Sequence, residues 1–115
     1  MAKNIPIDVI EKSFENSLCF GVYLNKTQIG YCRIISDYAT FAYLADVFIV
    51  EKQQGKGYSK ELMKSVMSHP QLQRLRKFLL ATADSHSLYK LFGFKELAKP
   101  ERMMEITVED IYLKK

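Results

Sequence analysis

One stretch of sequence decides the expected fold: Thr40-Phe41-Ala42-Tyr43-Leu44-Ala45-Asp46-Val47-Phe48-Ile49-Val50, followed by Gln54-Gly55-Lys56-Gly57-Tyr58-Ser59. Both alternating sets of its first part are largely apolar, which predicts a strand buried on both faces at the centre of a sheet. Its second part leads into residues 58–68, where apolar side chains recur at helical spacing and predict an amphipathic helix. Two glycines between a central strand and a helix allow the backbone to approach a ligand closely.

The glycine loop is typical of an anion site. The first N–H groups of a helix have no internal partners and lie at the positive end of the helix dipole, so a phosphate or pyrophosphate is the expected ligand. Lys56 adds positive charge. The loop lacks the Gly-x-x-x-x-Gly-Lys-Ser/Thr spacing of a P-loop and the third glycine of a dinucleotide fingerprint. Taken alone, it is either a phosphate site or a lysine-bearing turn.

The segments around this stretch predict an α/β domain. Apolar spacing predicts helices over residues 6–16 and 85–92, the second closed by Gly93. A hairpin is expected around Asn25-Lys26. The predicted strands are residues 18–24, 28–35, 40–50, 78–82, 94–97 and 103–108. We therefore expect one domain over residues 1–115, with a mixed, mostly antiparallel central sheet and flanking helices.

The composition is that of an ordinary soluble globular protein, with 48% hydrophobic and 26% charged residues. No apolar run approaches a membrane span of about 20 residues, and the start lacks a signal peptide, so we expect a cytoplasmic protein with no membrane partner. The net charge of +4 suits an anionic ligand. Lys and Arg are spread along the chain, apart from a cluster at Arg74, Arg76 and Lys77. This spread favours a solvated basic surface over nucleic-acid binding.

Cysteine and histidine usage predicts no metal site. Cys19 and Cys32 lie in predicted strands without metal-ligand spacing, and the chain has only two histidines. Free thiols in a reducing compartment are the expected state.

Three runs resemble the GNAT superfamily of N-acetyltransferases. Gln54-x-x-Gly57-x-Ser59 is similar to the family's Arg/Gln-x-x-Gly-x-Gly/Ala signature, and Leu88-Tyr89-Lys90-Leu91-Phe92-Gly93-Phe94 is similar to its Leu-Tyr-x-x-x-Gly-Phe run. Residues 43–49 resemble the family's strand before the loop. The resemblance covers roughly residues 17–106, and three shorter runs resemble short bacterial acetyltransferases: residues 15–22, 37–40 and 100–102.

The resemblance implies a GNAT-like fold and transfer of an acetyl group from acetyl-CoA to a primary amine of a small molecule or peptide, by direct attack and without a metal. The loop would bind the coenzyme A pyrophosphate. The backbones of Phe48 and Ile49 would bind the pantetheine arm as an added strand does. The implied cofactor-binding set is Phe48, Ile49, Gln54, Gly55, Lys56, Gly57, Tyr58, Ser59, Ser85 and Tyr89.

Two side chains are candidates for catalysis. The resemblance implies that Tyr89 protonates the departing thiolate or positions the sulfur, and its alternative is packing against Phe92 and Phe94. Asp46, the only acidic residue in its strand, is a candidate general base, or it hydrogen-bonds a neighbouring backbone group. His86 is a second candidate base, or a helix-start residue bonded to Asp84.

The chain departs from the family pattern in two places. Ser59 replaces the last small residue of the signature. Only one helix precedes the first predicted strand, with residues 1–3 expected inside the first helical region, whereas the family usually opens with an extra strand and helix. The resulting exposed sheet edge predicts pairing into a homodimer. It also leaves open a coenzyme A-binding sensor or interaction module without catalysis.

Overall fold

The sheet at the centre of the computed structural model, which describes residues 4–112, has four strands in the order β1-β2-β3-β4. β1 pairs with β2 and β2 with β3 in antiparallel fashion, whereas β3 and β4 run parallel. The predicted mixed, mostly antiparallel α/β fold is therefore confirmed. The strands are Leu18–Leu24, Thr27–Ser36, Phe41–Ile49 and Lys77–Leu80.

The predicted hairpin joins β1 to β2. Asn25 and Lys26 have φ angles of 50° and 70°, both in the left-handed region. A two-residue loop with this geometry matches the right-handed twist of the two strands that it connects.

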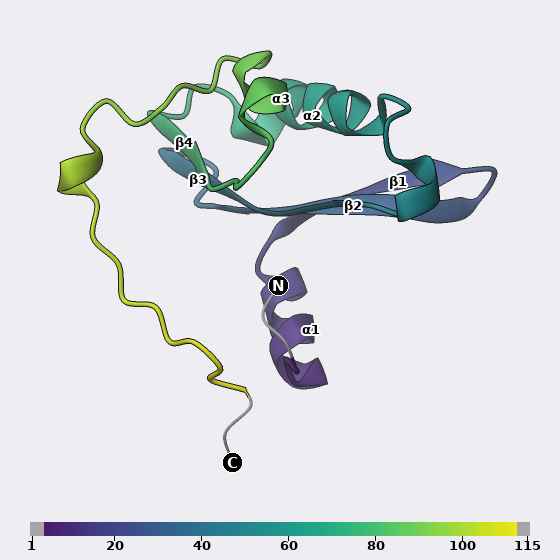
Figure 1. The fold of residues 1–115 in the computed structure, drawn as a ribbon, viewed down its shortest axis with the longest axis horizontal. Helices are drawn as coiled ribbons and strands as arrows, with labels where there is room; N and C mark the ends of the chain where they lie inside the picture. The colour runs from purple at the N-terminus through teal and green to yellow at the C-terminus, as the bar shows by residue number, and fades with distance from the viewer. Residues whose placement is uncertain (1–3, 113–115) are drawn as a thin grey trace.

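The helices lie on opposite sides of the sheet (Figure 1). α2 (Tyr58–Ser68) and α3 (His86–Lys90) cover one face, and α1 (Ile7–Glu15) lies on the other. α2 ends where predicted, because His69 precedes Pro70 and takes an extended conformation with ψ 131°. The buried core lies between the sheet and α2, and its fully buried side chains are Cys32, Ile34, Ala42, Met63 and Val66.

Two predicted strands are wrong. Residues 94–97 and 103–108 are not strands, although the second segment is extended. After α3, the chain passes through a short 3-10 turn at Pro100–Arg102 and runs away from the sheet (Figure 1). A strand needs a neighbour to pair its backbone groups, and none lies beside these segments in residues 4–112.

The first element of the described chain is α1. No strand precedes it within residues 4–112. The prediction for residues 1–3 lies outside the described part. Within residues 4–112, none of the helices combines the length and apolarity that crossing a bilayer requires.

Candidate functional site

A β-bulge in β3 decides which side chains reach the site. Arg33 of β2 pairs with Asp46, but the next residue, Ile34, pairs with Leu44, so Ala45 has no partner across the ladder. An extra residue of this kind reverses the alternation of the side chains that follow it. Val47 therefore joins Leu44 on the α2 side, whereas Asp46 lies on the α1 side.

The bulge also marks the point where β3 and β4 separate. The two strands pair only between residues 41–44 and residues 77–80. Beyond them lies a cavity of about 290 Å³, lined by the ends of both strands and by the start of α3. Its lining includes Leu44, Ala45, Val47, Leu80, Thr82, Ser85 and Tyr89.

The backbone groups at the end of β3 alternate in direction. Val50 N–H donates to Ile29 O of β2 at 2.8 Å, and backbone groups of successive strand residues point to opposite sides. The N–H and C=O groups of Ile49 therefore point away from β2, and the C=O accepts from Gln54 Nε2. Those of Phe48 point toward its β2 partner Tyr31, so the alternation disfavours Phe48 for binding an extended arm.

The loop between β3 and α2 has the conformation that its glycines predict. Gly55 and Gly57 have φ angles of 79° and 88°, and Gly57 forms the N-cap of α2. A Cβ added at either residue would meet nothing within 4 Å. The left-handed backbone, rather than crowding, is therefore what requires glycine here.

The loop presents free hydrogen-bond donors. No backbone or side-chain acceptor within residues 4–112 binds the N–H groups of residues 55–60. These groups lie at the N-terminal end of α2, where the helix dipole favours an anion. Gln54 Nε2 donates to Ile49 O at 2.9 Å and so fastens the loop to the end of β3. Lys56 Nζ donates to Gln53 Oε1 at 3.1 Å.

A second cavity, of about 560 Å³, lies along this loop. Its lining includes Gln54, Gly55, Gly57, Tyr58 and Ser59, and so brings most of the predicted loop residues together. It shares Val47, Ser85 and Tyr89 with the cavity between the strands. The two cavities therefore adjoin at these residues, and together, from the helix N-terminus to the opening between β3 and β4, they are called the groove here.

Tyr89 lies where the two parts of the groove meet. The residue is buried, and its ring contacts Phe94 edge-on with centroids 6.0 Å apart, so the packing against Phe94 that the sequence suggested is present. Its hydroxyl makes no hydrogen bond with the described residues and is not fully buried. Burial raises the pKa of the Tyr89 phenol, with smaller contributions from Cys32 and Asp84. The phenol therefore keeps its proton at neutral pH and can donate it.

Ser85 stands beside Tyr89 at the start of α3. Its N–H donates to Thr82 Oγ1 at 3.0 Å, and its hydroxyl donates to Asp84 Oδ1 at 3.1 Å. Its carbonyl accepts from the N–H groups of Leu88 and Tyr89. Ser85 thus orients the turn that carries Tyr89, and it lines both parts of the groove.

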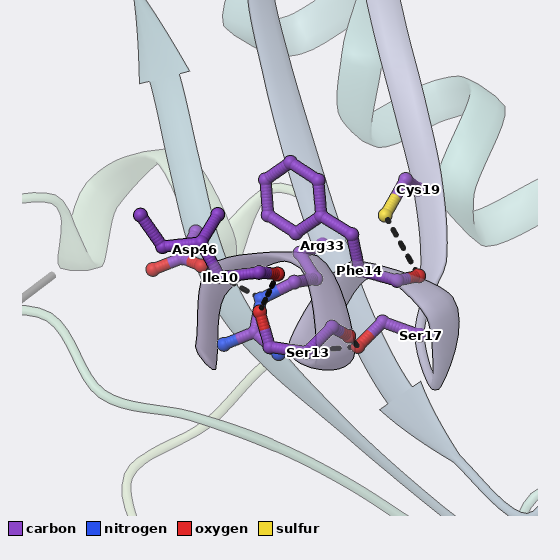
Figure 2. A network of polar contacts seen from close by, with 7 residues as sticks. All are labelled: Ile10, Ser13, Phe14, Ser17, Cys19, Arg33 and Asp46. Carbon is purple, nitrogen blue, oxygen red and sulfur yellow. Dashed lines mark hydrogen bonds and ion pairs between the residues drawn. The ribbon is translucent and has the colours of Figure 1, made fainter. Parts of the chain in front are cut away.

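Asp46 lies on the other face of the sheet (Figure 2). Arg33 Nε donates to Asp46 Oδ2 at 2.8 Å, and Arg33 Nη1 donates to Ser17 Oγ at 3.1 Å. Ser17 Oγ in turn donates to Ser13 O of α1 at 2.6 Å. Asp46 lines neither part of the groove. Its partner is thus an arginine, not the backbone group considered from sequence, and the network ties α1 to the sheet.

His86 lies outside the groove, in a cavity beside β4 that also reaches Tyr89. The carboxylate of Asp84 accepts from Ser85, and no hydrogen bond joins it to His86 in residues 4–112. In the same range, no three His, Cys, Asp or Glu side chains lie close enough to hold a metal ion.

Sequence reasoning missed the bulge and with it the role of Val47 as a lining residue. One feature of the sequence could have revealed the bulge. Strict alternation from the buried Ala42 and Leu44 would place the charged Asp46 in the apolar core. An unpaired residue before it resolves that conflict, because it turns the carboxylate to the other face.

The comparisons with known proteins agree on one family. The model of the acetyltransferase (GNAT) family matches residues 3–94. A crystal structure of a GNAT-family protein from Xanthomonas campestris pv. campestris has 47% sequence identity, covers 97% of this chain and 79% of its own, and has a TM-score of 0.92.

More distant relatives agree with this match. A protein of Gibberella zeae, assigned as an acetyltransferase, is 26% identical, and the match covers 93% of this chain and 72% of that protein. A crystal structure of a GNAT family acetyltransferase from Elizabethkingia anophelis with acetyl-CoA bound is 19% identical, covers 78% of this chain and 61% of its own, and has a TM-score of 0.64. At that identity the likeness concerns the fold.

Proposed function

Because the chain belongs to the acetyltransferase (GNAT) family and is an acyl-transferring enzyme, we propose that it moves an acetyl group from acetyl-CoA to a primary amine by direct attack on the thioester. The observation that carries the proposal is the groove of two adjoining cavities, which extend from the free N–H groups of residues 55–60 to Tyr89 and the opening between β3 and β4. An elongated ligand with an anionic end and an amide-bearing arm fits this shape and polarity.

The loop end of the groove suits the pyrophosphate. Several unpaired N–H groups at the N-terminus of α2 offer charge-complementary hydrogen bonds, and the side chain of Lys60 borders the same cavity. Gln54 acts on this site indirectly, because its side-chain amide donates a hydrogen bond to the carbonyl of Ile49. We therefore assign Gln54 to positioning the loop and the backbone of residues 55–60 to holding the anion.

The strand end of the groove suits the arm and the reaction. Ile49 lines the loop part of the groove, and its N–H, which points away from β2, can pair with an amide of the arm as it would with a neighbouring strand. In the reaction, the amine nitrogen bonds to the acetyl carbon, the carbon–sulfur bond breaks, and the nitrogen gives up one proton to water. The thiolate that leaves takes a proton, which we assign to the Tyr89 hydroxyl because it is protonated, makes no hydrogen bond with the described residues and belongs to a residue that lines the groove. The phenolate then regains a proton from water.

Ligand binding tests the donor. A ligand that binds only the folded state raises its stability, by about 2.7 kcal/mol at a concentration of 100 Kd. We expect acetyl-CoA to raise the melting temperature and ATP at the same concentration to leave it nearly unchanged. The absence of any shift with acetyl-CoA would contradict the proposed donor.

Tyr89→Phe tests the chemistry. Loss of a general acid typically lowers kcat by about 10²–10⁴-fold, and the acetyl-CoA thermal shift should persist because the ring is retained. Tyr43→Phe is the matched control, since it removes a phenol from β3 outside the groove. Full turnover in Tyr89→Phe would show that this hydroxyl does not protonate the leaving group.

A further inference from the structure

The cavity of about 290 Å³ between the ends of β3 and β4 is lined by three residues with hydroxyl groups, namely Thr82, Ser85 and Tyr89. The Ser85 hydroxyl donates to Asp84 Oδ1. Neither the Thr82 nor the Tyr89 hydroxyl donates to an acceptor within residues 4–112. Since the proposed reaction uses the proton of Tyr89, the hydroxyl of Thr82 is a second free donor for which the reaction so far has no role.

Thr82 is held in place by the turn that begins α3. Its Oγ1 accepts from the N–H of Ser85 at 3.0 Å. This bond uses one lone pair of the hydroxyl oxygen, and the hydroxyl proton stays free to rotate toward another acceptor. The Ser85 carbonyl in turn accepts from the N–H of Tyr89 at 3.3 Å. The two free donors therefore belong to one short turn, which fixes their relative position.

The wall of the cavity opposite Thr82 is aliphatic. The side chains that β3 contributes to the lining are Leu44, Ala45 and Val47. β3 and β4 stop pairing after Leu44 and Leu80, so Thr82 lies two residues beyond the last pair, where the strands have separated. A fixed hydrogen-bond donor among aliphatic side chains stabilises a developing negative charge more strongly than water does.

Acetyl transfer develops negative charge at two atoms. When the amine nitrogen bonds to the acetyl carbon, an electron pair of the carbonyl group moves onto its oxygen. When that pair returns, the carbon–sulfur bond breaks and the sulfur leaves as a thiolate. The oxygen and the sulfur are bonded to the same carbon, so the two donors that they need must lie close together. Two hydroxyl groups on one turn meet this requirement.

We propose that Thr82 is a second catalytic residue, whose hydroxyl donates a hydrogen bond to the thioester carbonyl oxygen while Tyr89 protonates the sulfur. Thr82 keeps its own proton throughout, because the negative charge on the oxygen disappears when the carbonyl group re-forms. This role rests on the proposed acetyl transfer and adds to it the group that stabilises the oxyanion. It also explains why the turn holds the Thr82 oxygen by the N–H of Ser85, which leaves the proton available.

Infrared spectroscopy of bound acetyl-CoA, isotope-labelled at its carbonyl carbon, tests the contact without an acceptor amine. A hydrogen bond to a carbonyl oxygen lowers its stretching frequency. Thr82→Val removes the hydroxyl at similar size and should raise the frequency of the bound ligand, whereas Thr82→Ser should leave it near the original value. Tyr89→Phe is the matched control, because this phenol is assigned to the sulfur, and the band should stay in place.

Two failures of this experiment are distinguishable. Acetyl-CoA that does not bind the original chain contradicts the proposed function and with it the role of Thr82. Acetyl-CoA that binds both the original chain and Thr82→Val with the same carbonyl frequency contradicts only the role of Thr82.

Turnover tests the effect on the reaction, measured as thiol released from acetyl-CoA with whichever of spermidine, histamine and glycinamide the original chain acetylates fastest. Loss of one donor to an oxyanion typically lowers kcat by about 10²–10³-fold, and we expect a loss of this size in Thr82→Val. The acetyl-CoA thermal shift should persist, and Thr82→Ser should keep most of the activity. Full kcat in Thr82→Val overturns the proposal.

A double variant separates this role from an indirect effect on Tyr89. Thr82→Val also removes the acceptor of the Ser85 N–H, which orients the turn. A variant that acted only by displacing Tyr89 would cost nothing further once the phenol is gone. We expect Thr82→Val/Tyr89→Phe to be slower than Tyr89→Phe alone by about tenfold or more. Equal rates in these two variants overturn the catalytic role of Thr82.

Discussion

The two faces of the sheet are held by different forces. Under α2 and α3 the contacts are apolar and dense, and every fully buried large side chain of the described chain belongs to that layer. Under α1 no helix residue is buried, and a chain of polar contacts from Asp46 through Arg33 to Ser17 and Ser13 links the helix to the strands (Figure 2). The core face resists deformation, whereas the α1 face depends on a few specific pairs.

This difference explains where the groove lies. A site made of backbone N–H groups works only if the loop and strands that carry it stay fixed, and the apolar core fixes them. The bulge at Ala45 sends each side chain to the face that suits it, Val47 to the groove and Asp46 to the polar network. Single substitutions on the core face and on the α1 face should therefore change the free energy of unfolding by different amounts.

The largest contrast is expected between two neighbouring isoleucines. Ile34 is 0% exposed on the core face, whereas Ile35 is 42% exposed on the other. Ile34→Ala should lower the free energy of unfolding by about 2–5 kcal/mol, because it leaves a cavity in a packed layer. Ile35→Ala should cost less than about 1 kcal/mol. Urea denaturation of both variants measures the difference, and equal losses would contradict the contrast between the faces.

The polar network should show the next largest effect. Asp46→Asn leaves the buried side of the Arg33 guanidinium without its charged acceptor, and we expect a loss of about 1.5–3 kcal/mol. The double variant Arg33→Met/Asp46→Leu removes both charges and should recover part of the loss. Urea denaturation of Arg33→Met, Asp46→Leu and the double variant gives the coupling energy of the pair. Additive losses would mean that Arg33 and Asp46 do not stabilise each other.

Sequence alone predicted the parts of the fold that rest on local chemistry. The ends of α2 follow from Gly57 and Pro70, and the hairpin follows from Asn25-Lys26, because each depends on backbone preferences of the residues themselves. The bulge was missed, since it depends on which residue of β2 meets Asp46. The last two strands were predicted wrongly, because an alternating pattern shows the faces of a strand and not whether a neighbour is present to pair with it.

The same distinction between local and long-range features applies to the candidate site. The loop residues and Tyr89 were predicted from short runs, and the structure brings all of them except Lys56 to the lining of one cavity. The role of Asp46 was left open, since nothing in the run around it shows that Arg33 lies 2.8 Å away. Partners separated by 13 positions in the chain, as these two are, come from the register of the sheet.

A smaller effect is expected from a substitution in the loop that lines the groove on the core face. Gly57→Ala keeps the space around the loop but forces a side chain into the left-handed region, which costs about 1–2 kcal/mol. We expect weaker acetyl-CoA binding in a thermal-shift titration and little change in the core. Gly21→Ala in β1 is the comparison on the other side of the sheet, where the conflict would be with the Tyr23 ring. Unchanged acetyl-CoA binding in Gly57→Ala would mean that the loop tolerates other backbone angles.

The last contrast has no effect at neutral pH and concerns the two cysteines, which lie on opposite faces. Burial raises the pKa of Cys32 from 9.0 to about 12, whereas Cys19 is exposed. Between pH 9 and 12 the unfolded chain releases the Cys32 proton while the folded chain keeps it. The stabilisation is therefore complete below pH 9 and declines as the pH rises toward 12, by at most about 1.4 kcal/mol per pH unit for one proton. Cys32→Ala should flatten this decline in urea denaturation, and Cys19→Ala should leave most of it. An equal flattening in both variants would mean that the two faces shield their thiols alike.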